Sequence, residues 1–291
     1  MGDGLLASSG EKWKKNRAIM ESAFATRESS RNFIQIFTEQ SRVLIEEIRD
    51  TRLGVACSLW PLIVKAVIQT VLEKIILDFL LKNNMTDEEI NDEIMTLIFA
   101  GIDTTVTALC FTLLMLAKNQ DIQEKVYEEI NTVFSGDKNK SAEFSELTKL
   151  TFLDQCIRES LRKLSVVPAV ERRVTNDVVL SDGRVVPTGS NLILSIYAIH
   201  NNPQYYPDPQ VWNPYNFDKD KVAQRPNHTF IPFATGLRQC LGYKFAMMSM
   251  KVFISTILQN FKLTTDQTEF QLDYYLIVRC RNGYQIKFEE R

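Results

Sequence analysis

The spacing of apolar residues predicts that the first 160 residues are mainly helical. Apolar positions recur at three- and four-residue intervals between residues 33 and 49, which predicts an amphipathic helix. Thr86-Asp87-Glu88-Glu89 is a capping box and predicts the start of a long apolar helix that runs to about Lys118. Further helices are expected from a capped start near Ser8, over 121–134 and over 152–163.

The pattern changes in the second half of the chain. Two short β-branched runs flank Ser181-Asp182-Gly183, which is typical of a hairpin, and a strand is expected over 192–197. Residues 200–228 are rich in Pro, Asn, Asp and Tyr and predict a long irregular segment. A helix is expected over 243–260, followed by a closing hairpin of 275–279 with 284–288. The predicted fold class is mainly α with small β-sheets (α+β).

Composition narrows the function classes. The 291 residues are 45% apolar and 24% charged, which is typical of a globular protein. A net charge of −2 gives no electrostatic reason to expect nucleic acid as a partner. Five cysteines without a C-x-x-C pair do not form a disulfide framework, and a reducing compartment fits them. Only two histidines are present, which disfavours a multi-histidine metal site.

One segment is long enough to cross a membrane. Residues 94–117 carry a single charge, Asp103. An acidic residue in the middle of a membrane span is costly, so a long buried helix is the favoured interpretation and a membrane span the alternative. The opening Met1-Gly2-Asp3-Gly4 leads into polar sequence and does not read as a signal peptide.

The most informative chemistry lies around Cys240. This cysteine stands in a loop bounded by Gly236 and Gly242, directly before a predicted helix. Free N–H groups at a helix start stabilise a thiolate, and Arg238 adds a positive charge two residues earlier. The two glycines permit the close approach of a flat ligand. From the residues alone, Cys240 is a nucleophile, an iron ligand or a buried cysteine near a helix start.

The pattern F-x-x-G-x-R-x-C-x-G, from Phe233 to Gly242, resembles the haem-binding signature of the cytochromes P-450. A chance match in a chain of this length is on the order of one in ten thousand. The resemblance implies haem b (heme) bound through Cys240 as the axial thiolate ligand of its iron. It also implies that Arg238 pairs with a haem propionate, that Phe233 lies beside the sulfur, and that Gly242 lets the haem approach the loop.

The segment from Ala100 to Thr105 resembles the oxygen-activation motif of the same family. The resemblance implies that Thr104 hydrogen-bonds to oxygen during its activation and that Asp103 relays protons. A threonine bonded to its own helix is the structural alternative. The resemblance also implies that Ala100 lies beside the haem, at the position where several animal relatives carry a glutamate esterified to it, so no such covalent link is expected.

Three further motifs follow the family order. Trp13 and Arg17 match W-x-x-x-R, and Arg172 ends a matching Pro168–Arg172 segment; all three residues are expected at the haem propionates, although a lone surface arginine is ordinarily only solvated. Glu159 and Arg162 match the E-x-x-R motif that anchors the irregular segment. Asn216 matches the third partner of this motif, where the family usually carries an arginine. Residues 167–170 match the segment expected on the substrate side of the haem.

The resemblance covers residues 1–59 and 72–291. It predicts one incomplete domain, 1–291, with the cytochrome P-450 fold but without its N-terminal part and the helices that roof the substrate pocket. The bridging stretch from Trp60 to Leu72 has no counterpart in the family. A splice form, a gene fragment or a mispredicted gene model would explain this arrangement.

The expected function is that of a haem-thiolate monooxygenase, similar to the animal fatty-acid ω-hydroxylase-like group in its insect-type branch. Such an enzyme inserts one oxygen atom from O₂ into an apolar substrate, a fatty acid or a xenobiotic. Electrons come from NADPH through a flavoprotein reductase, and the basic residues proposed for its docking are Lys12, Lys14, Lys15 and Lys244. The expected location is the cytoplasmic side of the endoplasmic reticulum membrane, with peripheral attachment to the membrane surface.

Two alternatives stay open. The first is a non-catalytic haem-binding form or an unstable fragment of such an enzyme, because loss of the roof helices would expose the haem and admit water. The second is an iron-free helical membrane protein, which rests on residues 94–117 alone.

Overall fold

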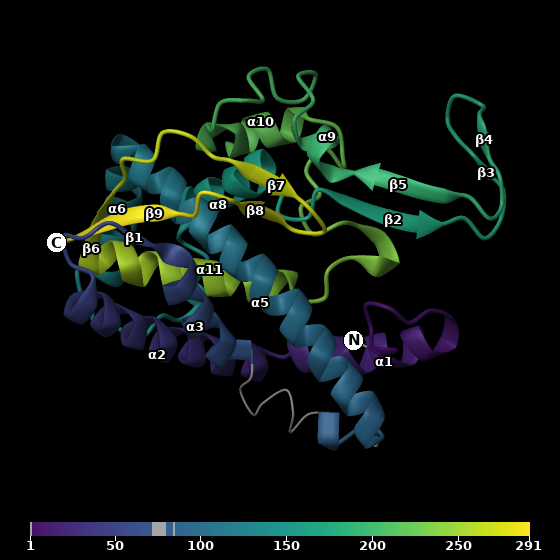
Figure 1. Cartoon of the computed structure of the whole chain (residues 1–291), viewed down its shortest axis with the longest axis horizontal. Coiled ribbons are helices and arrows are strands. Elements are labelled where there is room, and N and C mark those ends of the chain that lie inside the picture. The colour runs from purple at the N-terminus through teal and green to yellow at the C-terminus, as the bar shows by residue number, and fades with distance from the viewer. Residues whose placement is uncertain (1, 72–79, 84) are drawn as a thin grey trace.

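A computed structural model describes residues 2–71, 80–83 and 85–291. Its longest helix, α5 (Asp87–Lys118), crosses the molecule diagonally in Figure 1. The predicted capping box opens it: Glu89 donates its N–H to Thr86 Oγ1 at 3.2 Å, and Thr86 donates its N–H to Glu89 Oε2 at 2.9 Å. The predicted start and end of this helix are both confirmed. From Thr105 to Ala117 every residue is buried, because other helices surround this half of α5.

The helices around α5 form one packed layer. Helix α11 (Tyr243–Asn260) packs along α2 (Arg27–Thr51) and also contacts α5. The Phe245 ring meets the Phe33 and Phe37 rings edge-on, with centroids 5.0 and 4.8 Å apart. These apolar faces are the physical reason that the layer holds together. The remaining helices of this layer are α1 (Gly10–Ala25), α6 (Gln120–Phe134), α7 (Phe144–Leu147) and α8 (Thr151–Leu164).

The stretch from Trp60 to Leu72, which was expected to lack a counterpart in the family, lies in a helix up to Val71, and Leu72 lies outside the described residues. Helix α3 (Leu59–Val71) packs along α5 and against α2. Its buried residues Leu62, Ile63 and Val67 recur on one side at helical spacing. Pro61 lies in the first turn, where a missing N–H costs no hydrogen bond.

Four small antiparallel sheets in the described part of the chain complete the fold. The three-stranded sheet has the order β1 (Cys57–Ser58), β9 (Gln285–Glu290), β6 (Phe261–Thr264). The two-stranded pairs are β2 (Ala169–Arg173) with β5 (Asn191–Ser195), β3 (Val178–Val179) with β4 (Val185–Val186), and β7 (Leu272–Tyr274) with β8 (Val278–Cys280). The predicted hairpin around Asp182 and Gly183 is confirmed as β3–β4.

The predicted closing hairpin is wrong. Strand β8 pairs with β7, the strand that precedes it in the chain, whereas β9 pairs with β6 and β1. The chain does turn where expected, since Gly283 donates its N–H to the Cys280 carbonyl at 3.1 Å. The two strands separate after that turn because Ile286 and Phe288 on β9 are completely buried in the core beside β6.

The expected strand over 192–197 ends two residues early. Ser195 caps a short helix, α9 (Ile196–His200), by accepting the Ala198 N–H at 3.2 Å. The irregular segment that follows contains η1 (Pro214–Phe217) and α10 (Lys219–Gln224). Its long irregular course is otherwise as expected.

A buried ion pair anchors this irregular segment. Arg162 and Glu159 are both inaccessible to solvent, and the two guanidinium–carboxylate hydrogen bonds measure 2.7 and 2.8 Å. Asn216 donates its side-chain N–H to Glu159 at 3.2 Å, so it takes the place of the missing arginine. The remaining donors of Arg162 bond to the carbonyls of His200, Pro209 and Val211.

Helix α5 is the described helix that is long and apolar enough to cross a membrane. Of its most apolar stretch, 61% is buried inside the protein. This burial fits the expectation of a core helix and disfavours the alternative of an iron-free membrane protein, because the core is built around α5.

Candidate functional site

A tight loop carries Cys240 into α11. The Cys240 N–H donates to the Phe233 carbonyl at 2.9 Å, and the Gln239 N–H donates to the Gly236 carbonyl at 3.0 Å. Gly236 has φ of 77°, in the region that favours glycine, and it opens η2 (Gly236–Arg238). In Figure 1 the yellow-green segment before α11 lies between β2 and α1.

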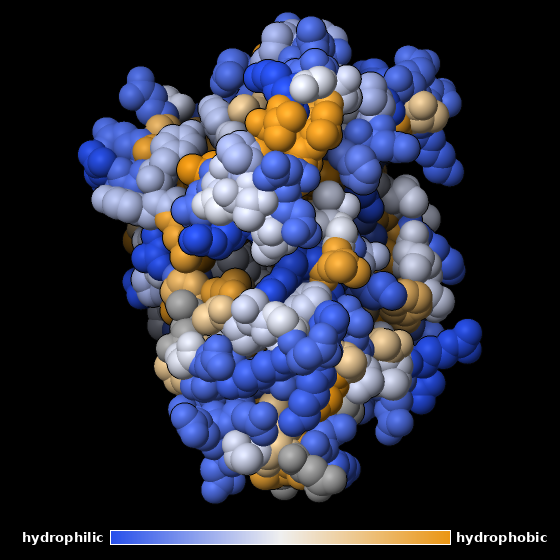
Figure 2. Space-filling view, turned by 90° about the vertical axis from the view of Figure 1, so that its right-hand side faces the viewer, coloured by the Kyte–Doolittle hydropathy of each residue, from blue (hydrophilic) through white to orange (hydrophobic). Residues whose placement is uncertain are grey.

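Cys240 differs from the other cysteines in its exposure. As a residue Cys240 is exposed, whereas the other four cysteines are buried, namely Cys57, Cys110, Cys156 and Cys280. Desolvation by the loop raises the pKa of the Cys240 thiol, while the Gly242 N–H and the Arg17 charge act in the opposite direction. Figure 2 looks at the side of the molecule where β2, β5 and α1 lie, and shows it hollowed, with hydrophilic residues beside the opening.

Three arginines gather near the Cys240 loop. The Arg238 guanidinium lies 4.0 Å from the centroid of the Trp13 ring and donates to the Ser8 carbonyl at 3.0 Å. Arg17 donates to the Gln239 carbonyl at 2.8 Å and pairs with Glu21 at 2.6 Å.

In the described part of the chain, the Arg172 side chain donates a hydrogen bond to the carbonyl of its neighbour Glu171, at 2.8 Å, and to no other group. Desolvation and then the charges of Arg172 and Arg17 lower the pKa of Arg238. Within the described ranges, no carboxylate forms an ion pair with Arg172 or Arg238. Arg172 and Arg238 can therefore bind an anionic ligand.

The residues at this loop fit haem b. An exposed cysteine in a loop that also carries Arg238, with Arg17 and Arg172 near that guanidinium, matches an iron-centred ligand that carries two carboxylates. A side chain built onto Gly236 or Gly242 would meet no atom within 4 Å, so the space over the loop is open for a flat group. Phe233 supplies an apolar ring there and packs 5.9 Å from the Tyr243 ring.

The predicted α5 residues lie apart from the loop contacts. Thr104 donates to the Ala100 carbonyl at 2.6 Å, which is the intrahelical alternative, and Ala100 itself is exposed. Asp103 forms an ion pair with Arg279 of β8. No hydrogen bond or ring contact within the described ranges joins these α5 residues to the Cys240 loop.

Sequence reasoning missed the partners that hold these groups. Arg279 lies 176 residues from Asp103, and Ser8 lies 230 residues from Arg238. Ser8 acts through its backbone carbonyl, which leaves no signature in the sequence. The lysines proposed for reductase docking are partly neutralised, since Lys12, Lys14 and Lys15 pair with Asp3, Glu11 and Glu89, whereas Lys244 is exposed.

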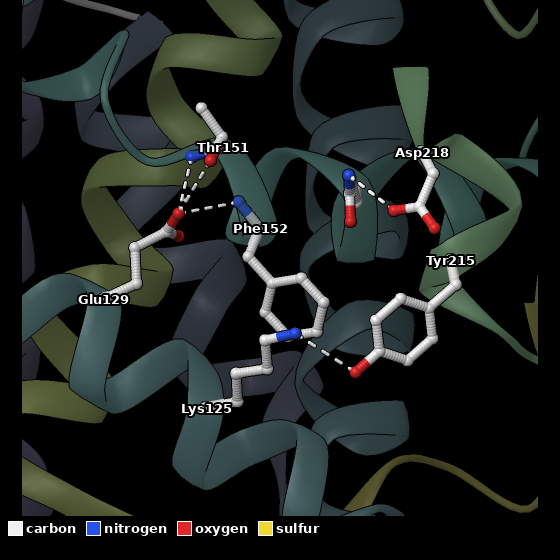
Figure 3. A pocket seen from close by; sticks show the side chains of 7 residues that line it. Lys125, Glu129, Thr151, Phe152, Tyr215 and Asp218 are labelled. Atoms are coloured by element: carbon white, nitrogen blue, oxygen red, sulfur yellow. Dashed lines mark hydrogen bonds between the residues drawn. The ribbon is translucent and has the colours of Figure 1, made fainter. Parts of the chain in front are cut away.

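A second hollow, of about 350 Å³, lies between α6, the start of α8 and η1 (Figure 3). Its polar groups bond to one another: Glu129 accepts the N–H groups of Thr151, Phe152 and Leu153. The Lys125 amine lies 4.1 and 4.8 Å from the Phe152 and Tyr215 ring centroids. This hollow is lined by two helices and by the irregular segment. None of the predicted site residues lines it.

Comparison with known proteins identifies the family. The sequence model described as "Cytochrome P450" matches residues 68–288. Cytochrome P450 4F2 of Homo sapiens is 38% identical over 205 residues, which cover 70% of this chain and 39% of that protein. The ultra-long-chain fatty acid omega-hydroxylase of Homo sapiens is 40% identical over 206 residues, with the same coverage. Cytochrome P450 4g15 of Drosophila melanogaster is 34% identical over 210 residues, 71% of this chain and 36% of that protein.

These matches confirm the resemblance to the animal fatty-acid hydroxylase-like group, with both human and fly members. This chain covers well under half the length of these relatives. Trp13 and Arg17 precede the family match, and the structure is what connects them to the Cys240 loop. The signature at Cys240, the α+β fold and the extent of the match together show that the chain belongs to the cytochrome P450 family.

Proposed function

We propose that this chain binds haem b through the Cys240 thiolate and acts as a monooxygenase on a fatty acid or another apolar molecule. The observation that carries the proposal is an exposed cysteine in an open loop that also carries Arg238, with Arg17 bonded to the loop and Arg172 near Arg238. When bound, haem with a thiolate ligand supplies the redox chemistry that activates O₂ for insertion of one oxygen atom into the substrate.

The arginines bind and orient the cofactor. Arg238, Arg172 and Arg17 offer guanidinium donors to the two propionates, and such pairs are stronger than neutral hydrogen bonds. The Trp13 ring holds the Arg238 guanidinium flat by a cation–π contact. Phe233 and the two glycines leave an apolar, open surface beside the sulfur.

Asp103 and Thr104 relay protons that the reaction consumes, and solvent is the source of these protons. Thr104 Oγ1 currently donates its hydrogen to the Ala100 carbonyl, so it must rotate to donate elsewhere. Asp103 is held by Arg279, and this pair must open for the carboxylate to pass on a proton. Both side chains are partly exposed, which leaves them access to solvent protons.

A relative's name supports the substrate class, and the partners are those that we expect for the family. One relative's name states that it hydroxylates ultra-long-chain fatty acids at the ω position, which supports a fatty acid as the substrate class. The partly exposed residues from Val167 to Val170 supply an apolar wall for it. Electrons from NADPH arrive through a flavoprotein reductase, and the exposed Lys244 is a cation at which the reductase docks. The protein acts on the cytoplasmic side of the endoplasmic reticulum membrane.

One observation favours a second candidate function, haem binding without turnover. The β2–β5 ribbon projects from the molecule in Figure 1 and exposes Leu192, Ile193 and Leu194. An isolated two-stranded ribbon is marginally stable in water, and open access of water separates oxygen activation from substrate oxidation.

A spectrum followed by a turnover assay tests the proposal. Purified protein is reduced and exposed to carbon monoxide, and the proposal expects a strongly red-shifted Soret band that Cys240→Ser abolishes. Product is then sought with reductase, NADPH and a fatty acid. The thiolate band without product supports the haem-binding alternative. A band typical of histidine-ligated or free haem, or no haem, overturns both candidates.

A further inference from the structure

Glu93 is a fully buried carboxylate of α5 that holds the start of the chain. Its Oε2 accepts the Leu5 N–H at 3.1 Å, and its Oε1 accepts the Asn16 side-chain N–H at 2.9 Å. Burial raises the pKa of Glu93, and these two hydrogen bonds act against that rise. A carboxylate in such a position is costly unless its oxygens have partners, so the two donors explain how it is tolerated.

The segment that Glu93 holds lies very close to α5. A side chain on Gly4 would begin 2.3 Å from Thr96 Oγ1 and 2.6 Å from the Asp92 carbonyl oxygen. The Gly4 carbonyl accepts the N–H groups of both Ala7 and Ser8 at 2.9 Å, which folds the segment into a compact turn. This turn fixes the place of the Ser8 backbone.

The Ser8 carbonyl is the hydrogen-bond acceptor that connects this turn to Arg238. Arg238 Nη2 donates to it at 3.0 Å while the guanidinium lies over Trp13. A continuous path of contacts therefore runs from Glu93 through Leu5, the Gly4 turn and Ser8 to Arg238.

We propose that Glu93 is a positioning residue for Arg238, and that through Arg238 it determines how tightly this chain binds the haem carboxylates. The inference rests on the proposed function. It assigns a role to a residue that touches neither the haem nor the substrate.

The chemistry of Asn16 makes the inference specific. Asn16 Oδ1 is buried and has no hydrogen-bond partner in the described part of the chain. In Glu93→Gln the new amide oxygen accepts the Leu5 N–H, and the new amide N–H donates to Asn16 Oδ1 after the Asn16 amide turns over. Glu93→Leu has a similar size but offers no acceptor, so the Leu5 N–H and the Asn16 amide lose their partners.

The test compares two ligands that differ only in their carboxylates. The full chain is loaded with haem or with haem dimethyl ester, and the dissociation rate is measured by transfer to an excess of a haem-scavenging apoprotein. Haem is expected to leave Glu93→Leu about tenfold faster than wild type, the loss expected for one charge-assisted hydrogen bond. Glu93→Gln should match wild type, and the dimethyl ester should leave all three proteins at one rate.

Two outcomes overturn the inference. Equal acceleration for haem and for its dimethyl ester means that Glu93 only supports packing. A Glu93→Gln variant as impaired as Glu93→Leu means that the charge, not the pair of hydrogen bonds, matters. Glu129→Leu is the matched control, since that carboxylate also accepts backbone N–H groups but lies in the separate hollow of Figure 3. Glu129→Leu should lower the stability of the fold without changing the release rate of haem relative to that of the dimethyl ester.

Hydrogen exchange separates this inference from the proposed function. The Leu5 amide should exchange faster in Glu93→Leu than in wild type, whether or not haem is bound. Wild type that binds no haem refutes the proposed function, whereas unchanged Leu5 exchange refutes the role of Glu93. If Glu93→Leu does not fold, Gly4→Ala is the second variant, because it disturbs the same turn through its contact with Thr96. Gly4→Ala should accelerate the release of haem but not of the dimethyl ester.

Discussion

Arg279 of β8 forms an ion pair with Asp103 in the middle of α5, across 176 residues of sequence. The Arg279 guanidinium also lies 5.1 Å from the Trp60 ring centroid, so α3 supports the pair from a third element. This arrangement connects α3 to a residue of the proposed proton path.

Asp103→Asn should slow product formation about 100-fold, because an amide cannot relay a proton and general acid catalysis contributes about that much. The measurement is NADPH-dependent product formation with saturating reductase, at equal haem content. Glu88→Gln, an exposed change near the start of the same helix, is the control and should leave the rate unchanged. Equal rates for Asp103→Asn and wild type would remove Asp103 from the proton path.

Arg162→Leu should destabilise the protein by about 3–5 kcal/mol, because it leaves the Glu159 carboxylate buried without its cation. Urea unfolding followed by circular dichroism gives the free energy. Arg158→Leu on the same helix removes the partly exposed pair with Asp154 and should cost less than about 1 kcal/mol. Similar losses for both variants would contradict the assignment of the anchor to the buried pair.

His200 should make the protein less stable as the pH falls. Its Nε2 accepts the Ile231 N–H at 2.8 Å and its Nδ1 lies 3.1 Å from Ser165 Oγ, so the folded chain holds the ring neutral. Burial, together with the Arg162 charge, lowers its pKa from 6.5 to about 3. Below pH 6.5 the unfolded chain binds a proton that the folded chain does not, and stability falls until about pH 3.

The size of this effect is up to about 1.4 kcal/mol per pH unit. Urea unfolding at several pH values between about 5 and 7 measures it. His200→Gln should flatten the dependence, whereas His228→Gln, at an exposed position, should preserve it. A dependence that survives in His200→Gln would show that other groups cause it.

The Cys240 thiol should be the first to react with iodoacetamide in protein without haem, because the other four cysteines are buried. Its raised pKa means that the rate reaches half its maximum at a pH above 9.0, the ordinary value. Bound haem should block the reaction, and Cys240→Ser should remove the fast phase. Rapid labelling in the presence of haem would contradict ligation by this sulfur.

The boundaries of several elements were readable from local chemistry. The capping box at Thr86 and Glu89 and the apolar run after it determined α5, because both depend on residues within a few turns of one another. The turn at Asp182 and Gly183 determined β3–β4 for the same reason. The Cys240 signature identified the family because its ten positions are contiguous.

Strand pairing near the end of the chain was not readable in this way. The segment 284–288 alternates like any half-buried strand, and its partner is chosen by which face can be buried. Ile286 and Phe288 reach the core beside β6, and a hairpin with β8 would not place them there.

The sequence by itself therefore determined the family, the helical frame and the residue proposed to bind iron, since these are encoded in short contiguous patterns. Only the tertiary structure decided what holds the proposed site together. Glu93 reaches Arg238 through the backbone of Leu5 and Ser8, and Arg279 reaches Asp103 from another sheet. Backbone carbonyls and long-range ion pairs carry no local pattern, because their partners come together only when the chain packs.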